Sequence, residues 1–182
     1  MGGNEKLVFE LSLEGLFIRG IRDLITWQLK AELRTLGIDL DRKLPRSVSR
    51  ETWYASLNLV VKHLFPEHPR DEAHRLIGQR LMFGTENTFP GRAIAPMVRK
   101  LGPRRVLKRL PRNMKASNNF ANGVITELSP TSVQLDVDDI GDAPGIFVGT
   151  LERMVAWAGG SDVVVTMNAT PPSATYVVSW AE

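Results

Sequence analysis

Residues 146–160 read IFVGTLERMVAWAGG, and this stretch decides the fold because a helix here separates two pairs of alternating segments. Its apolar residues recur at the spacing of one helix face: Phe147, Leu151, Met154, Val155 and Ala158. The pair Gly159-Gly160 is typical of a helix end. Strand-like alternation is found before and after this helix, over 120–128, 132–137, 162–167 and 175–180. The order ββαββ predicts an antiparallel sheet with a helix across one face, an α+β arrangement.

The first part of the chain is predicted to be mainly helical. Residues 7–18 are apolar-rich with partial alternation, and we expect them to be extended. Helical spacing then predicts three helices, over 21–36, 50–64 and roughly 70–83. Ser49 is the predicted cap of the second helix, and Gly37 is the predicted end of the first. We therefore expect one domain over 1–182, with a mainly helical part over 1–117 packed on a ββαββ part over 118–182.

Composition excludes several classes of protein. The chain has 182 residues, of which 43% are hydrophobic, which is enough for one well-buried domain. It has no cysteine, which removes disulfides, thiolate metal sites and cysteine nucleophiles. The charged residues Glu5, Lys6 and Glu10 do not fit a secretory signal. There is no run of 18 apolar residues, so we expect no membrane partner and a cytoplasmic location.

Positive charge is concentrated in one segment. Between Thr88 and Thr126 there is no Asp or Glu, but there are nine cations: Arg92, Arg99, Lys100, Arg104, Arg105, Lys108, Arg109, Arg112 and Lys115. Since the whole chain carries +3, the remainder carries −6. The molecule is therefore predicted to be strongly dipolar.

The same segment is predicted to be amphipathic. Thr88 is the expected cap of a short helix over 90–101, and Gly102-Pro103 begins another that Pro111 ends or kinks. On the second helix Leu107, Leu110 and Met114 are predicted to face inward. The predicted outward residues are Arg104, Lys108, Arg112 and Lys115. We expect the segment to lie on a folded body rather than to form a charged tail.

Landmarks recur along the whole chain: EGLFIRG at 14–20, LGIDL at 36–40, EAHRLIGQRLMFGTENTFPGRA at 72–93, LGPRRVLKRLPRNMKASNNF at 101–120, FVGTLERMVAWAGG at 147–160 and YVVSW at 176–180. This pattern resembles a myxobacterial paralogue family of unknown function. The resemblance carries no established activity. From FVGTLERMVAWAGG to YVVSW the sequence is also similar to the ligand-sensing folds of the haem–nitric-oxide-binding and 4VR groups, which implies a sensory role.

An anion or acidic partner is the first candidate ligand. The candidate residues are Arg92, Arg104, Arg105, Lys108, Arg109 and Arg112, since guanidinium groups bind phosphate through two hydrogen bonds. We expect Gly84, Gly91 and Gly102 to shape the backbone around them. The alternative is a solvated helix face, or cations that pair with the acidic remainder of the chain.

A pocket between the helical part and the sheet is the second candidate. Its expected lining residues are Phe89, Phe120, Phe147 and Trp157. The alternative is a plain packed core, which aromatic residues often fill.

Metal and catalytic sites are not predicted. The three histidines, His63, His68 and His74, lie apart, and a Tyr-x-Ser-x-Arg signature for haem propionates is missing; we therefore expect no cofactor, with haem left open. The run DVDDIGD at 136–142 has Ile140 where a calcium loop needs an oxygen ligand, so we interpret it as a strand end and turn. Since no nucleophile elbow or phosphate loop occurs, we do not expect an enzyme.

These observations favour a non-enzymatic regulatory or sensory protein that recognises a small ligand or an acidic protein partner near the basic segment. One alternative is a nucleic-acid-associated protein that uses the patch over 92–115. A second is an enzyme that acts on a phosphorylated metabolite. The sequence leaves open whether the chain forms a homo-oligomer.

Overall fold

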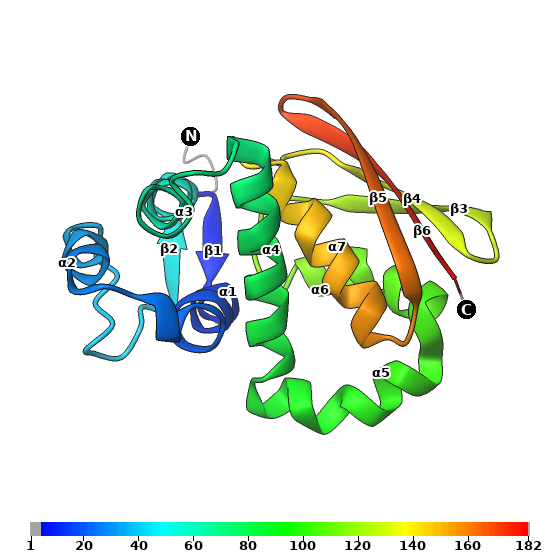
Figure 1. Cartoon of the computed structure of the whole chain (residues 1–182), viewed down its shortest axis with the longest axis horizontal. Helices are drawn as coiled ribbons and strands as arrows, with labels where there is room; N and C mark the ends of the chain where they lie inside the picture. Colours follow the sequence, from blue (N-terminus) through cyan, green and yellow to red (C-terminus); the bar gives the residue numbers. More distant parts are fainter. Residues whose placement is uncertain (1–4, 182) are drawn as a thin grey trace.

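The alternating segments of the second half form one four-stranded antiparallel sheet. In the computed structural model, which describes residues 5–181, the strand order is β3-β4-β6-β5 (Figure 1). The strands are β3 (Gly123–Ser129), β4 (Ser132–Val137), β5 (Ser161–Thr170) and β6 (Ser173–Ala181). Helix α7 (Gly145–Trp157) lies across one face of this sheet. The predicted ββαββ order and the α+β class are confirmed.

The sheet is apolar on the face that α7 covers. Alternate residues of the two central strands are buried there: Val133, Leu135 and Val137 of β4, and Tyr176, Val178 and Trp180 of β6. Leu135 and Tyr176 are direct cross-strand neighbours. Since strand side chains alternate between faces, this pairing fixes which residues reach the core.

The first segment differs from the sequence prediction. Only Leu7–Phe9 (β1) of residues 7–18 is extended, and it pairs with a second short strand, Ser47–Ser49 (β2), which the sequence did not predict. The chain then turns helical in α1 (Glu10–Leu13) and in the π-helix η1 (Glu14–Gly20). The reason is that Leu13, Leu16 and Phe17 are spaced for one helix face, and all three are fully buried.

The predicted helix over 21–36 is divided. A 3-10 turn, η2 (Arg22–Leu24), is followed by extended backbone at Ile25 and then by α2 (Trp27–Thr35). The interruption has a local cause, because the Thr26 hydroxyl accepts a hydrogen bond from the Leu29 N–H at 3.2 Å and so caps α2. Gly37 follows this helix with a φ of 84°, as expected of a residue just past a helix end.

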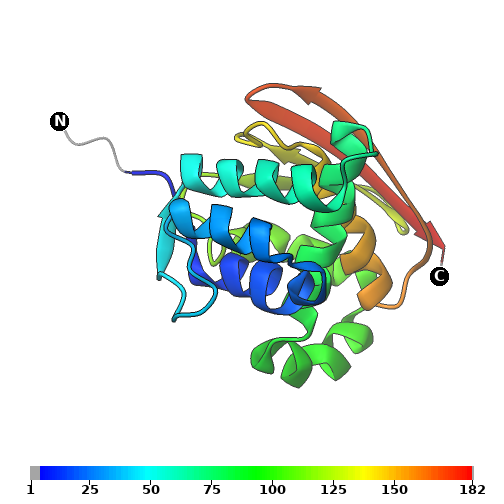
Figure 2. The same ribbon diagram turned by 60° about the vertical axis from the view of Figure 1, so that its left-hand side comes forward.

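The next two helices agree with the sequence. Helix α3 (Arg50–Leu64) begins at Ser49, whose hydroxyl accepts the Thr52 N–H at 3.1 Å, so the predicted cap is confirmed. Helix α4 (Arg70–Glu86) lies between the N-terminal elements and α7 (Figure 1). Figure 2 shows α2 (blue) and α3 (cyan) side by side, and α3 also packs against α4.

At three glycines, helix α4 and its neighbours approach each other backbone to backbone. A Cβ atom on Gly78 would overlap the carbonyl oxygen of Ile146, and one on Gly149 of α7 would overlap that of Arg75. On the opposite side, a Cβ on Gly84 would overlap the carbonyl oxygen of Gly15 in η1. Only glycine permits these approaches, so the positions of α7 and η1 against α4 depend on it.

The basic segment forms α5 (Phe89–Lys108) and α6 (Leu110–Met114). The Thr88 hydroxyl caps α5 by accepting the Gly91 N–H at 3.1 Å, as predicted. Gly102 interrupts α5 with a φ of 75°, a left-handed value that favours glycine, so the two expected helices meet at this residue. Leu107, Leu110 and Met114 are buried, as their spacing predicted. Within residues 5–181, no helix combines the length and the hydropathy needed to cross a membrane.

We expect the substitution Gly149→Ala to lower the free energy of unfolding by about 2 kcal/mol, because the added methyl group collides with the backbone of α4. At a helix position with free space, the change from Gly to Ala stabilises a protein by about 0.5–1 kcal/mol. The sign of the change in unfolding free energy therefore shows whether the close contact exists. Urea unfolding followed by circular dichroism measures it. The control is Ala156→Gly on the exposed side of α7, which should cost only about 1 kcal/mol. A Gly149→Ala protein as stable as the parent would contradict the close contact.

Candidate functional site

A cavity of about 500 Å³ lies between the helical part and the sheet part. Its walls come from β1 and α1, from α3 and α4, from α5 and α6, and from α7 with the segment that leads into it. The lining is mainly apolar and includes Trp53, Leu81, Met82, Met114, Ile146 and Met154. A mainly apolar hollow of this size, with a few polar groups, is typical of small-molecule sites.

The cavity opens to solvent through one segment. Its exposed lining residues all lie between 90 and 116: Pro90, Ile94, Met97, Arg109, Asn113 and Ala116. Arg109 is the one basic residue of the lining, and it has no acidic side chain within 4 Å among residues 5–181. The mouth is therefore polar at Arg109 and Asn113 and apolar at Ile94 and Met97.

Three of the four aromatic residues expected at a pocket lie at this one. Phe120, Phe147 and Trp157 line the cavity, and the Phe147 ring packs on Tyr176 with 5.6 Å between centroids. Phe89 does not line it, because this side chain points outward and is 80% exposed. The expectation for Phe89 is therefore corrected.

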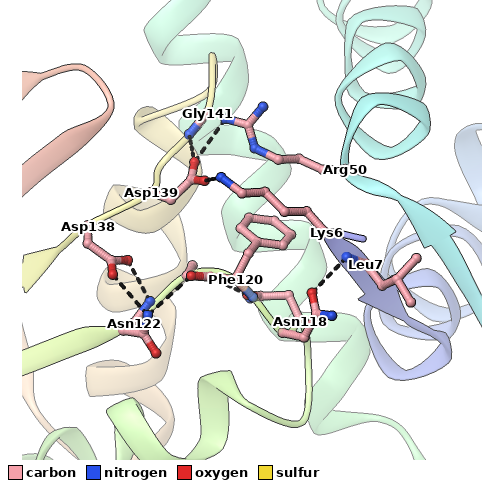
Figure 3. Close-up of polar contacts among 11 residues, drawn as sticks. Lys6, Leu7, Arg50, Asn118, Phe120, Asn122, Asp138, Asp139 and Gly141 are labelled. Carbon is pink, nitrogen blue, oxygen red and sulfur yellow. Dashed lines mark hydrogen bonds and ion pairs between the residues drawn. The ribbon is translucent and has the colours of Figure 1, made fainter. Parts of the chain in front are cut away.

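Asp139, which lines the cavity, belongs to an ion cluster with Lys6 and Arg50 (Figure 3). Lys6 Nζ donates to Asp139 Oδ2 at 2.7 Å, and Arg50 donates to Oδ1 at 2.9 Å. Asp139 is buried, and it also accepts the Gly141 N–H at 3.2 Å. The cluster connects the start of β1, the start of α3 and the loop after β4, so it joins both parts of the chain.

Aromatic rings lie against the cations of this cluster. The Arg50 guanidinium carbon is 5.1 Å from the Tyr54 ring centroid and 5.8 Å from that of Phe120. Lys6 Nζ is 6.0 Å from the Phe120 centroid. These distances allow cation–π attraction, which holds Phe120 at the cavity wall.

The cluster keeps Asp139 ionised. Burial alone would raise the pKa of its carboxyl, but the hydrogen bonds from Lys6 and Arg50 outweigh burial, and the pKa lies below its ordinary value of 3.8. From the sequence alone, this aspartate is predicted only to be part of a strand end and turn. Its partners are 133 and 89 positions away, so no local pattern indicated them.

The structure divides the predicted basic residues into three groups. Arg104 and Lys108 both bind Glu127 of β3, at 2.6 and 2.5 Å, and their hydrogen bonds lower the pKa of Glu127 to about 2. Arg109 lies at the cavity mouth. The remaining predicted residues, Arg92, Arg105 and Arg112, are exposed, with no acidic side chain within 4 Å in the described part of the chain. One common anion site for all six is not assembled.

Of the predicted backbone glycines, Gly91 lines the cavity, Gly84 contacts η1, and Gly102 breaks α5. None of the histidines lines the cavity. His63 contacts Glu32 at 2.9 Å, His68 is exposed, and His74 is buried in α4.

The donor set of the cavity does not fit haem iron. Iron in haem proteins is held by His, by Cys, by Met with His, or by a Tyr phenolate. The lining offers only methionines and Tyr54, and burial raises the pKa of Tyr54, which disfavours the phenolate. Residues 5–181 also contain no group of three His, Cys, Asp or Glu placed to hold a metal ion.

We expect Asp139→Asn to lower the free energy of unfolding by about 2 kcal/mol, because the amide leaves Lys6 and Arg50 without a counterion in a partly buried site. Chemical denaturation at neutral pH measures the loss. The control Asp142→Asn changes an exposed carboxylate three residues later and should stay within about 0.5 kcal/mol of the parent. Equal effects of the two substitutions would show that the cluster contributes nothing.

His74 gives a second expectation, concerning pH. Neither ring nitrogen has a hydrogen-bond partner among residues 5–181, and burial lowers the pKa of His74 below 6.5. At low pH the unfolded chain therefore binds a proton at His74 more readily than the native state does. The free energy of unfolding should fall as pH falls below about 6.5. Unfolding free energies measured at pH 7.5, 6.5 and 5.5 should show this fall in the parent protein. The control protein His68→Gln, changed at an exposed histidine, should show the same fall, and His74→Leu should show a smaller one. The same slope in His74→Leu would refute the assignment.

Comparison with solved structures shows that this fold is that of H-NOX proteins. An H-NOX protein mutant from S. oneidensis in the Fe(II) state has a TM-score of 0.68 at 12% identity, over 94% of this chain and 95% of that one. An Fe(II) unliganded H-NOX protein from K. algicida has a TM-score of 0.67 at 10% identity, again over 94% and 95%. The similarity expected for the C-terminal part therefore extends along nearly the whole chain.

A third similar structure is an oxygen-binding H-NOX domain related to soluble guanylate cyclases, with a TM-score of 0.61 at 12% identity, over 94% of each chain. No curated protein matches the sequence. Residues 6–181 match a family described as a protein of unknown function (DUF2378). The match covers all but the ends of the chain, and the protein therefore belongs to the DUF2378 family.

Proposed function

We propose that this chain is a non-enzymatic sensory or regulatory protein that binds an amphipathic small molecule in the cavity between its two parts. The observation that carries the proposal is the apolar cavity of about 500 Å³, whose mouth is formed by Arg109 and Asn113. An apolar tail would occupy the interior, and an anionic or polar head would lie at the mouth.

Three polar groups of the cavity support this ligand chemistry, because they already have partners within the protein. The Thr85 hydroxyl donates to the Leu81 carbonyl at 2.9 Å, and the Thr88 hydroxyl donates to the Thr85 carbonyl at 2.8 Å. Asp139 is held by two cations. A deeply bound polar molecule would have to break these contacts, whereas an apolar chain would leave them intact.

The H-NOX-like fold supports the sensory part of the proposal. Among the similar structures, one was studied for its haem redox potential, at 15% identity and a TM-score of 0.61, and another is an oxygen complex. At such identities the likeness concerns the fold alone. Since the cavity donors do not fit haem iron, we propose a ligand that needs no iron.

The test uses delipidated protein and two probes of equal length, dodecanoate and dodecanol, titrated by calorimetry. We expect dodecanoate to bind with 1:1 stoichiometry. Arg109→Gln should weaken dodecanoate about tenfold, because a charge-assisted contact is lost, and should leave dodecanol unchanged. The matched control is Arg105→Gln, an exposed arginine that does not line the cavity.

Two results would overturn the proposal. One is that neither probe binds the delipidated protein. The other is that haem is bound, seen either as haem that co-purifies in stoichiometric amount or as the absorption band of a ligated iron after hemin is added. Either observation would show that the protein does provide ligands for haem iron.

A further inference from the structure

The first half of α5 exposes large apolar side chains, two of which, Ile94 and Met97, lie at the mouth of the cavity. Phe89 is 80% exposed, the highest value among the exposed large hydrophobic residues of 5–181, and Met97 and Ile94 are 51% and 43% exposed. Ala93 and Pro96 are exposed beside them. The inner residues, Gly91 and Val98, are buried at the cavity. This segment is therefore apolar on both sides, whereas an ordinary surface helix is polar outside.

Unpaired cations surround these side chains. Arg92, Arg99 and Lys100 are exposed, and within residues 5–181 no acidic side chain lies within 4 Å of any of them. The contrast with the second half of α5 is clear, because Arg104 and Lys108 there are neutralised by Glu127. The apolar and the unpaired basic side chains thus occupy the same three helical turns.

We propose that this α5 surface, Phe89 to Lys100, docks on an anionic membrane surface. Phe89, Ile94 and Met97 would enter the boundary between headgroups and acyl chains, while Arg92, Arg99 and Lys100 contact lipid phosphates. Exposed aromatic and aliphatic side chains flanked by Arg and Lys are the combination that interfacial helices use. No membrane partner is expected from the sequence, because it has no run of 18 apolar residues, but docking of this kind needs no membrane-spanning segment.

Charge complementarity alone would also suit a nucleic acid backbone. That partner offers no apolar environment for Phe89, Ile94 and Met97, and stacking on bases needs aromatic side chains along the basic groove. Of the three exposed large apolar residues on α5, one is aromatic and two are aliphatic. An anionic lipid surface would bind both the apolar and the basic side chains, whereas a nucleic acid would bind only the basic ones.

The experiment measures co-sedimentation of the full chain with vesicles of phosphatidylcholine alone or mixed equally with phosphatidylglycerol, at low salt and at about 1 M salt. We expect binding to the anionic vesicles at low salt and little to neutral ones. Arg92→Gln with Arg99→Gln should weaken partition about 25-fold, from roughly fivefold for each cation near the surface. Phe89→Ser should weaken it about tenfold.

Matched controls are present on α2 and its flanks. Trp27 is 76% exposed, so Trp27→Ser removes an equally exposed aromatic residue away from the basic segment. Arg22→Gln with Lys43→Gln removes two exposed cations elsewhere. Both control proteins should bind the vesicles as the parent does. Since every changed residue is exposed, circular dichroism should show an unaltered fold in all of them.

Three outcomes would overturn the proposal. The first is equal partition of the Phe89→Ser protein and the parent, which would mean that no side chain enters the bilayer. The second is an equal loss in the control proteins, and the third is binding to duplex DNA with none to anionic vesicles. Arg109 is not one of the docking residues, so Arg109→Gln should change dodecanoate binding without abolishing vesicle binding.

Discussion

Helix α4 lies between two backbones with no side chain to separate them. Gly84 faces the carbonyl of Gly15 on one side, while Gly78 and Gly149 close the contact with α7 on the other. Since α7 covers the sheet and η1 packs in the N-terminal core, these contacts set the distance between the two halves. The cavity occupies the space that remains between them, and its size follows from glycine positions that do not line it.

The parts of the fold that the sequence predicted are those in which local periodicity decides the structure. The helix around Leu151 and the two hairpins are such cases, and so is the cap at Ser49. The prediction that residues 7–18 are extended was wrong beyond Phe9, because other apolar residues in the stretch obscure the helical spacing of Leu13, Leu16 and Phe17. Strand β2 could not be predicted, since Val48 gains its strand geometry only by pairing with Val8, forty positions earlier.

The candidate site follows the same rule. Three of the predicted aromatic side chains lie at the cavity because they point toward the core: Phe120, Phe147 and Trp157. Phe89 does not, because the start of α5 is apolar on both sides and spacing alone cannot distinguish inside from outside. The ion cluster of Asp139 could not be predicted, because only the tertiary fold brings Lys6 and Arg50 close to it. The whole-chain sequence resemblance indicated the family, whereas the chemistry of the cavity became visible only in three dimensions.

The left-handed turn at Gly102 has a mechanical consequence. The preceding part of α5 begins at the Thr88 cap and ends at this turn, so it forms a helical segment with its own direction. Its inner side chains bound the cavity, and its outer side chains form the molecular surface. A shift of this segment from within would therefore shift the surface as well.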